Sequence, residues 1–270
     1  MRSLRFADKI LAVMRRDLLT ALRYRSSFLM GAIAVLAELA AFFYLSRSIG
    51  PSFRPQGMGY FPFLLAGTGL YTFLMMGISS FVTSVQEAQQ TGTLEVLMTS
   101  STPPAMLVFL SAISAFARNG VRLLFYCAAG LLLLSEGNLG VPNFAGCALV
   151  LIFSFVIAAA IGMAAAALQL STQKGSAAMW LFGSVAWFMT GTLFPVQSLP
   201  RPLLRLAELI PVTHCLDALR LALFQSGNTA ALGREILVLA AFSLTILPLS
   251  LVFFSWTLRR ARLEGMLSAY

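Results

Sequence analysis

Few side chains in this sequence could do chemistry, and most of them lie in or beside apolar stretches. Glu38 stands midway along an apolar run, where an ionised carboxylate costs about 3 kcal/mol, so we expect it to be protonated, paired or turned toward a cavity. His214 is the single histidine and has no second histidine or carboxylate at ligand spacing, which argues against a zinc or di-iron site. We expect His214 to hydrogen-bond nearby helix backbone or to pack beside Asp217. Asp217 and Arg220 stand three positions apart and can form an ion pair on a helix.

Motifs for metal or nucleotide chemistry are missing from the sequence. Cys127, Cys147 and Cys215 are widely spaced in apolar or mixed segments, which is typical of small buried hydrophobes and not of a disulfide framework or a metal site. No Gly-x4-Gly-Lys-Ser/Thr phosphate loop occurs, so the chain cannot hold ATP by itself. The apolar stretches also lack the clustered His, Asp or Ser of a membrane-bound enzyme. We therefore expect no catalytic residue, no metal site and no cofactor bound by this chain.

The composition identifies the solvent that must surround the elements positioning these residues. Hydrophobic residues make up 59% of the 270 positions and charged residues 11%, with a mean hydropathy of +0.84. Polar residues are too few to coat a water-facing surface, so most of the chain must face lipid. This excludes a soluble globular fold.

Six stretches are long and apolar enough to span a bilayer as helices, since a span needs about 20 residues. They cover residues 27–46, 60–84, 112–134, 142–170, 177–196 and 235–258. The fold class predicted is all-α integral membrane, with a six-helix transmembrane domain over 27–258. Glycines within the spans, Gly67 among them, indicate ordinary close packing of membrane helices.

The basic residues lie mainly at the two ends of the chain. Of 19 Lys and Arg, seven precede the first span and three follow the last, which predicts cytoplasmic termini and contact with anionic lipid headgroups, not with nucleic acid. Residues 1–26 have helical spacing of apolar positions and predict a basic interfacial helix, although a plain cytosolic leader would carry the same charges. Residues 259–270 would form a cytoplasmic tail. Arg118 and Arg122 share one face of the third span, where they could reach lipid phosphates or serve a substrate.

The first cytoplasmic loop predicts a short helix that could dock onto a soluble partner. Residues 86–101 are polar in their first half, and Leu94, Leu97 and Met98 give the helix one apolar edge. Pro103 then stops it before the third span. A merely solvated helix with capping Thr and Glu side chains is the alternative interpretation.

The last external loop, 197–234, is too apolar to extend freely into water. It contains two short amphipathic segments separated by Pro211, over about 200–225. We expect them to enter the outer leaflet as a re-entrant hairpin, which is tolerated only when the hairpin packs against protein.

These two loops carry motifs that resemble those of the ABC-2 transporter permeases. One motif is a Glu-rich stretch leading to Gly-Thr-Leu-Glu before a Thr-Pro, and the other is a series of Gly-x-Leu-Phe-Pro, Leu-Pro, Pro-x-Thr and Asp-Ala-Leu-Arg. The first is carried by Glu87, Gly92, Thr93, Leu94 and Glu95. The second is carried by Gly191, Leu193, Phe194, Pro195, Pro200, Pro211, Thr213, Asp217 and Arg220. The resemblance covers nearly the whole chain.

The resemblance implies a partner, a pathway and a gate. Residues 86–101 would be the coupling helix that sits in a cleft of a separate ATPase subunit, which holds ATP and Mg. Two permeases, identical or different, would pair in the cell (inner) membrane around a path between their first, second and fifth helices. The external gate would include Pro195, Pro200, Pro211, Asp217 and Arg220. The charges of Arg118 and Arg122 depart from the family pattern and leave the membrane depth of the third span open.

The function expected is that of the permease of an ATP-driven exporter. A proton-coupled secondary transporter that depends on Glu38 is the alternative, but it would have no obvious use for the cytoplasmic coupling loop. The short external loops leave lipidic or amphipathic compounds and lipid-linked glycans as candidate substrates, with hydrophobic compounds favoured slightly.

Overall fold

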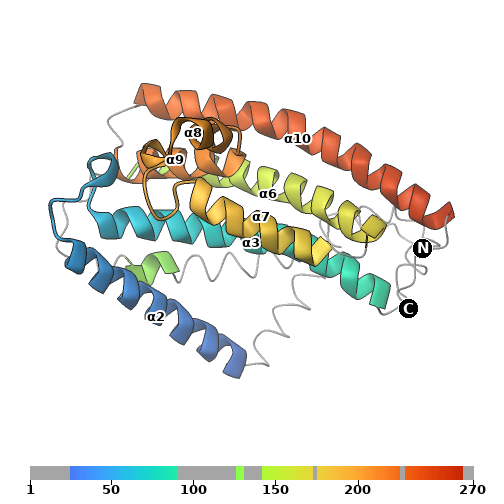
Figure 1. Ribbon diagram of the computed structural model, residues 1–270, viewed down its shortest axis with the longest axis horizontal. Helices are drawn as coiled ribbons and strands as arrows, with labels where there is room; N and C mark the ends of the chain where they lie inside the picture. The colour runs from blue at the N-terminus through green and yellow to red at the C-terminus, as the bar shows by residue number, and fades with distance from the viewer. Residues whose placement is uncertain (1–24, 91–125, 131–141, 173–174, 226–228, 264–270) are drawn as a thin grey trace.

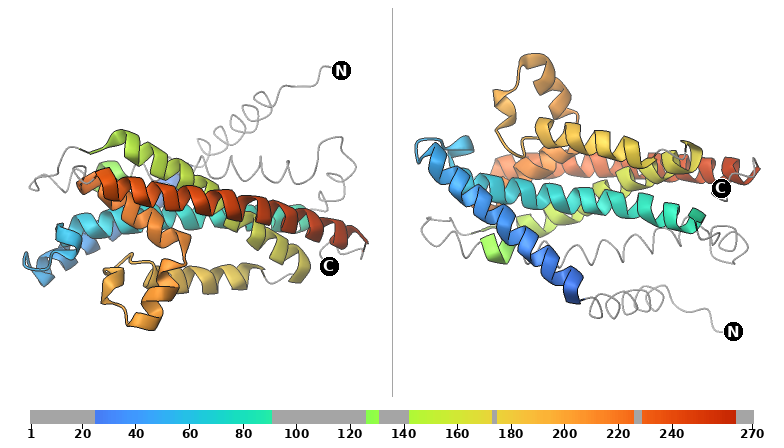
Figure 2. Two further views of the ribbon diagram at one scale, coloured as in Figure 1. Left: turned by 90° about the horizontal axis from the view of Figure 1, so that it is seen from above. Right: turned by 60° about the horizontal axis from the view of Figure 1, so that its bottom comes forward.

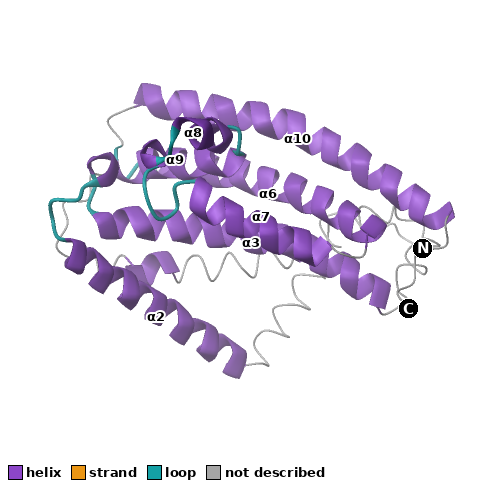
Figure 3. Cartoon of the chain, in the orientation of Figure 1, coloured by secondary structure: helices purple, strands orange, loops and turns teal. Residues whose placement is uncertain are grey.

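The computed structural model describes residues 25–90, 126–130, 142–172, 175–225 and 229–263. Every regular element within these ranges is a helix (Figure 3). Most of the predicted interfacial helix 1–26, most of the third span 112–134 and the tail from 264 lie outside the described residues. The all-α prediction is confirmed for the part of the chain that can be described.

Four long apolar helices match four of the six predicted spans. They are α2 (Arg25–Ile49), α3 (Tyr60–Gln90), α6 (Phe144–Thr172) and α10 (Thr229–Leu263). Their candidate spanning segments are Leu29–Ile49, Tyr60–Gln90, Phe144–Ser171 and Thr229–Ala261. Each exceeds the length of about 20 residues that crosses the hydrocarbon core, so the protein is a multi-pass membrane protein.

The fifth predicted span is shorter in the structure than in the sequence prediction. Helix α7 covers Gly175–Met189, 15 residues, which is about 22 Å of helix. It ends because Gly191 takes a left-handed φ of 79°, a conformation that terminates helices, and Pro195 follows soon after. The predicted segment 177–196 thus included a turn that apolar composition alone does not reveal.

The core lies where α3, α6 and α10 run side by side (Figure 1). At one end of this bundle, buried side chains of α3 and α6 meet α9 (Pro211–Phe224) and α10, among them Leu74, Ile157, Leu216 and Leu239. At the other end Phe81, Met163 and Phe254 pack together. Helix α6 fits between its neighbours because its second half is rich in alanine, which lets the helices approach closely.

Helix α2 leans away from the bundle and touches it through one small cluster (Figure 2). Val35 and Leu39 of α2 meet Phe61 and Leu65 of α3, together with Tyr126. The outer faces of the long helices are strongly apolar: Leu237, Leu244 and Leu249 of α10 are each more than 70% exposed. Exposed leucines in such numbers are expected of a surface that contacts lipid.

Helices α2 and α7 run opposite to α3, α6 and α10, so the direction alternates along the chain and the bundle has two distinct ends (Figure 1). Helices α3, α6 and α10 begin at the same end (Figure 1). Helix α7 ends toward it and α9 lies there, with the N–H of Asn143 donating to Ala222 O at 2.9 Å. Helix α3 runs from this end to Gln90 at the opposite one. The bundle therefore has an end that holds α9 and an end that holds Glu87.

Candidate functional site

Two short helices follow α7, divided by the proline that the sequence analysis singled out. They are α8 (Arg201–Glu208) and α9 (Pro211–Phe224), and Pro211 opens the second at a position where its missing N–H costs nothing. Thr213 Oγ1 donates to Ala207 O at 2.7 Å and fixes the bend between them. Of the other two prolines expected at the gate, Pro195 precedes the 3-10 turn η2 (Val196–Ser198) and Pro200 precedes α8.

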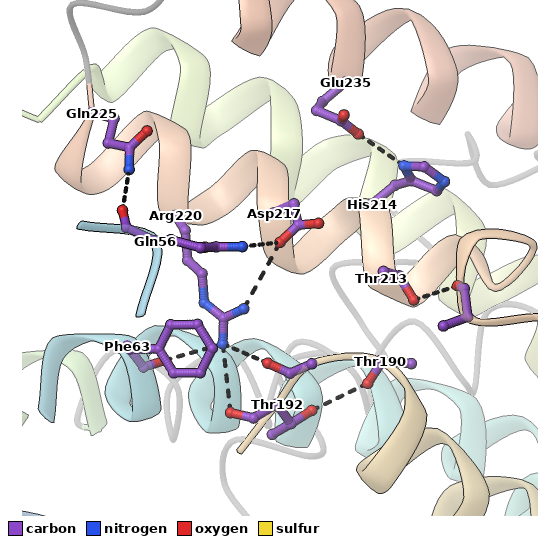
Figure 4. A network of polar contacts seen from close by, with 12 residues as sticks. Gln56, Phe63, Thr190, Thr192, Thr213, His214, Asp217, Arg220, Gln225 and Glu235 are labelled. Carbon is purple, nitrogen blue, oxygen red and sulfur yellow. Dashed lines mark hydrogen bonds and ion pairs between the residues drawn. The ribbon is translucent and has the colours of Figure 1, made fainter. Parts of the chain in front are cut away.

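Arg220 of α9 is the largest fully buried side chain of the described residues, and its charged end points into the protein. It is 1% exposed. Its Nη2 donates to Gly191 O at 2.8 Å and to Phe63 O at 3.2 Å, and lies 3.5 Å from Thr192 O (Figure 4). A buried cation is tolerated only when such partners replace its hydration shell. Arg220 thereby links α9 to the start of α3 and to residues 190–194, which we call the turn after α7.

An aromatic ring adds to this arrangement. The guanidinium carbon of Arg220 lies 3.6 Å from the centroid of the Phe63 ring (Figure 4). A desolvated contact of this kind contributes about 2 kcal/mol. We call Arg220, Phe63, Gly67, Gly191 and Thr192 the arginine lock.

Both glycines of the arginine lock are required by space or backbone angle. A Cβ on Gly67 would lie 2.5 Å from Arg220 Nη2 and 2.6 Å from Thr192 O. Gly191 has φ of +79°, which other residues adopt only with strain. The sequence-based interpretation of Gly67 as ordinary helix packing was therefore incomplete, because this glycine makes room for a guanidinium and a backbone carbonyl.

Asp217 is a weaker partner of Arg220 than the sequence spacing predicts. Its Oδ1 lies 3.9 Å from Arg220 Nη1, which is an ion pair without a hydrogen bond. The same oxygen accepts from Gln56 Nε2 at 3.0 Å, and Gln225 Nε2 in turn donates to Gln56 O at 2.6 Å. Burial raises the pKa of the Asp217 carboxyl and lowers the pKa of the Arg220 guanidinium to about 10, so Arg220 stays charged at neutral pH.

His214 joins α9 to α10 through a partner that sequence reasoning missed. Its Nδ1 lies 2.8 Å from Glu235 Oε2, and its Nε2 lies 2.9 Å from Glu208 O (Figure 4). The hydrogen bond to Glu235 raises the pKa of His214 more than desolvation lowers it. Because both neighbours are acceptors, the doubly protonated ring satisfies both. The expected bond to helix backbone is confirmed, whereas Glu235, 21 positions away, obeys no short-range spacing rule.

Glu38 does not belong to the arginine lock. It is half-buried on α2, and it interacts electrostatically with Tyr126, next to the cluster that holds α2 against α3. The expectation that Glu38 is protonated, paired or turned toward a cavity stays a prediction.

Glu87 lies in the last turns of α3, at the end of the bundle away from the arginine lock. Residues 86–90 continue α3 without interruption, so the predicted coupling helix does not begin at residue 86 as a separate element. Gly92, Thr93, Leu94 and Glu95 lie outside the described residues. The prediction for them stays a prediction.

An open groove of about 570 Å³ runs between α3 and α7. Its walls are mostly apolar. Tyr71 bridges it: its hydroxyl donates to Gly183 O at 2.6 Å, and its ring meets that of Trp187 edge-on, with 4.9 Å between the ring centroids. The lining residues are Tyr71, Thr72, Met75, Met76, Ser79, Gly183, Ser184, Trp187 and Phe188. Such a surface suits an apolar or amphipathic molecule and offers little to a charged one.

These features define a multi-pass α-helical membrane protein with a buried polar network at one end of its bundle. Residues 8–224 match the ABC-2 type transporter family, and the chain belongs to that family. It is thus the transmembrane permease of an ABC-2 type transporter, and its membrane domain is not itself catalytic.

No curated protein matches the chain. Within the described residues no group of three or more His, Cys, Asp or Glu could hold a metal ion.

Proposed function

We propose that this permease forms the transmembrane pathway of an exporter that is driven by a separate ATPase subunit. ABC-2 permeases generally pair with such a subunit, and the present sequence has no phosphate loop of its own. Two permease chains, identical or different, would enclose the pathway. ATP-driven closure of two ATPases would push the coupling segments together and move the permeases between inward-open and outward-open states.

The observation that carries this proposal is the reach of α3. Its 31 residues make a helix of about 46 Å. Phe63 and Gly67 of the arginine lock lie near its start, and Glu87 lies near its end, next to the predicted ATPase contacts Gly92 to Glu95. One continuous helix therefore joins the two regions that an ATP-driven permease must couple.

The topology we propose has six spans and cytoplasmic termini. The helix directions support it, because α3 ends at one end of the bundle and α6 begins at the other (Figure 1). One further span, which we assign to 112–134, would return the chain between them, and α7 would supply the sixth. The basic residues at both ends of the sequence favour cytoplasmic termini by the positive-inside rule. Helices α8 and α9 then lie in the outer leaflet, with α9 packed against α3, α6 and α10.

The substrate class we propose is hydrophobic or amphipathic, with a lipid-linked glycan as the second candidate. The groove between α3 and α7 supports the first, since methionine and aromatic side chains form most of its wall. Methionine adapts to varied apolar shapes, and Tyr71 and Trp187 offer flat faces for stacking. The second permease would close the open side of this groove.

Affinity purification of the tagged permease from native membranes in mild detergent tests the proposal. We expect a stoichiometric soluble ATPase to copurify, and to be lost when residues 92–95 are deleted without loss of folded permease. Glu87→Lys should weaken the association, while Glu208→Lys, a charge reversal on the exposed α8, should leave it unchanged.

Two results would contradict the proposal. One is the repeated absence of any ATPase from an intact permease, together with transport that survives ATP depletion. That outcome would favour a proton-coupled carrier and direct attention to Glu38. The other is an unchanged association after both the deletion and the Glu87 reversal, which would remove the coupling role from this segment.

A further inference from the structure

Arg220 is held firmly but incompletely. Every hydrogen bond of the Arg220 side chain is made by Nη2. Its Nε and Nη1 atoms have no hydrogen-bond acceptor among the described residues. Leaving buried donors of a charged group without acceptors is unfavourable. The arrangement in this structure therefore does not satisfy Arg220 fully, and a second arrangement would offer an acceptor to the nitrogens that now lack one.

The acceptor for that second arrangement is already in place. Asp217 lies one turn away on the same helix, with Oδ1 3.9 Å from Nη1 of Arg220. Its carboxylate offers two oxygens to the guanidinium fork, which is the strongest pairing available to an arginine. In the present state this carboxylate accepts a hydrogen bond from Gln56 instead.

We propose that Arg220 is a positioning residue that alternates between two sets of acceptors during the transport cycle. In the first state it bonds the carbonyls of Gly191 and Phe63 and holds the turn after α7 against α3. In the second state it pairs with Asp217, and the turn after α7 is free to separate from α3. This inference rests on the proposed function, because the cycle of the ATPase would drive the change.

The neighbouring contacts show why the change would spread beyond one side chain. The turn after α7 is held to the start of α3 by Arg220 and by Tyr60 Oη, which donates to Leu193 O at 3.1 Å. The groove is lined by these same two helices, α3 and α7. Releasing the arginine lock would therefore loosen the junction between the two walls of the groove, leaving the bonds from Tyr60 to Leu193 O and from Tyr71 to Gly183 O as bridges between them.

Gln56 connects the loop before α3 to the same exchange. It has a left-handed φ of 52°, which is strained for a residue other than glycine, and it is held there by Asp217 and Gln225. When Asp217 turns to Arg220, Gln56 loses one of its two side-chain partners. The loop that leads into α3 would then relax together with the turn after α7.

Distance measurements between two spin labels test this proposal without knowledge of the substrate. The labels are placed on Ser52→Cys, in the loop before α3, and Ser198→Cys, after the turn, both exposed, in a chain without its three native cysteines. The complex with its ATPase is measured in lipid nanodiscs, alone and with Mg-ATP and vanadate. Wild type is expected to show one short distance alone and an additional longer one with nucleotide and vanadate.

Two variants are expected to shift this distribution in opposite directions. Arg220→Lys keeps the charge but loses the fork and the flat stacking on Phe63, so the longer distance should rise about tenfold in population without nucleotide. Asp217→Asn keeps the acceptor for Gln56 but weakens the second set, so the longer distance should fall with nucleotide and vanadate. Arg205→Lys on the exposed α8 is the matched control and should behave as wild type.

Opposite shifts separate a positioning role from a structural one, because general loosening would move both variants the same way. The inference is overturned if folded Arg220→Lys and Asp217→Asn both match wild type, or if both raise the longer distance. If Arg220→Lys fails to fold, Asp217→Asn alone decides, since a normal response to nucleotide in that variant contradicts the second acceptor set. If no ATPase associates with wild type, the proposed function fails, and the comparison of Arg220→Lys with wild type in the permease alone still decides the inference.

Discussion

The guanidinium carbon of Arg220 lies 3.6 Å from the centroid of the Phe63 ring, although the two residues stand 157 positions apart in the chain. The ring covers one side of the guanidinium, whose Nη2 donates to the backbone carbonyls of Phe63, Gly191 and Thr192. This pairing fixes α9, the start of α3 and the turn after α7 in one arrangement. The charge of Arg220 and the aromatic face of Phe63 thus add to the apolar packing that holds α9 against α3 and α6.

Replacing Phe63 by leucine is expected to destabilise the permease more than the same change at Phe61. Phe61 is also a buried ring of α3, but its aromatic partner is Phe43, and among the described residues no arginine lies over it. The difference between the two variants isolates the cation–π contact, about 2 kcal/mol for a desolvated pair. Unfolding of the purified variants by titration with denaturing detergent measures it. Equal losses at both positions would show that Phe63 contributes only its volume.

Adding one methyl group at Gly67 should disrupt the arginine lock. The Cβ of Gly67→Ala would lie 2.6 Å from the carbonyl oxygen of Thr192, and a backbone atom cannot move aside cheaply. Overpacking of this kind costs about 1–3 kcal/mol. Gly31→Ala on α2 is the control, because its Cβ would meet nothing within 4 Å and alanine favours the helix. Thermal unfolding should show a lower midpoint for Gly67→Ala only.

The sequence predicts much of this fold because lipid imposes a simple rule on it. Stretches of about 20 apolar residues must become helices, and four of the predicted spans are present as long helices. Pro211 predicts the division between α8 and α9 for an equally local reason, since proline opens helices and cannot continue them. The end of α7 at Met189 was missed because it depends on the left-handed angle of Gly191 and not on composition.

The candidate site is only half visible in the sequence. Asp217 and Arg220 are conspicuous as charges in an apolar region, and their spacing predicts a pair. The stronger partners of Arg220 are backbone carbonyls, and a carbonyl leaves no mark on residue type. Glu235 is a similar case, because its contact with His214 arises from the packing of α9 against α10 and from no pattern within either helix. Tertiary contacts of this kind require the fold.

The groove between α3 and α7 should reject charge on its wall but tolerate changes of shape. Met75→Arg would place an unpaired cation among apolar side chains, so binding of the uncharged aromatic dye Nile red should fall by at least about tenfold. Met75→Leu conserves the volume and is expected to bind as wild type does. Fluorescence titration of the purified permease in nanodiscs measures both. Equal affinities for the two variants would place the dye in the surrounding lipid and not in the groove.

The stability of the junction between α9 and α10 should depend on pH through His214. The Glu235 carboxylate, the Glu208 carbonyl and Asp217 raise the pKa of His214 from its ordinary value of 6.5, against a smaller opposing effect of burial. A raised folded-state pKa means that the charged ring stabilises the native state: this contribution is fully present below pH 6.5 and is lost as the pH rises through the folded-state pKa. The midpoint of thermal unfolding should therefore fall across that interval. His214→Gln should remove this dependence on pH, and Glu235→Gln should reduce it. Both variants are also measured in the Asp217→Asn background, because burial raises the pKa of the Asp217 carboxyl as well. A midpoint in His214→Gln that follows the same pH course as wild type would show that another group is responsible.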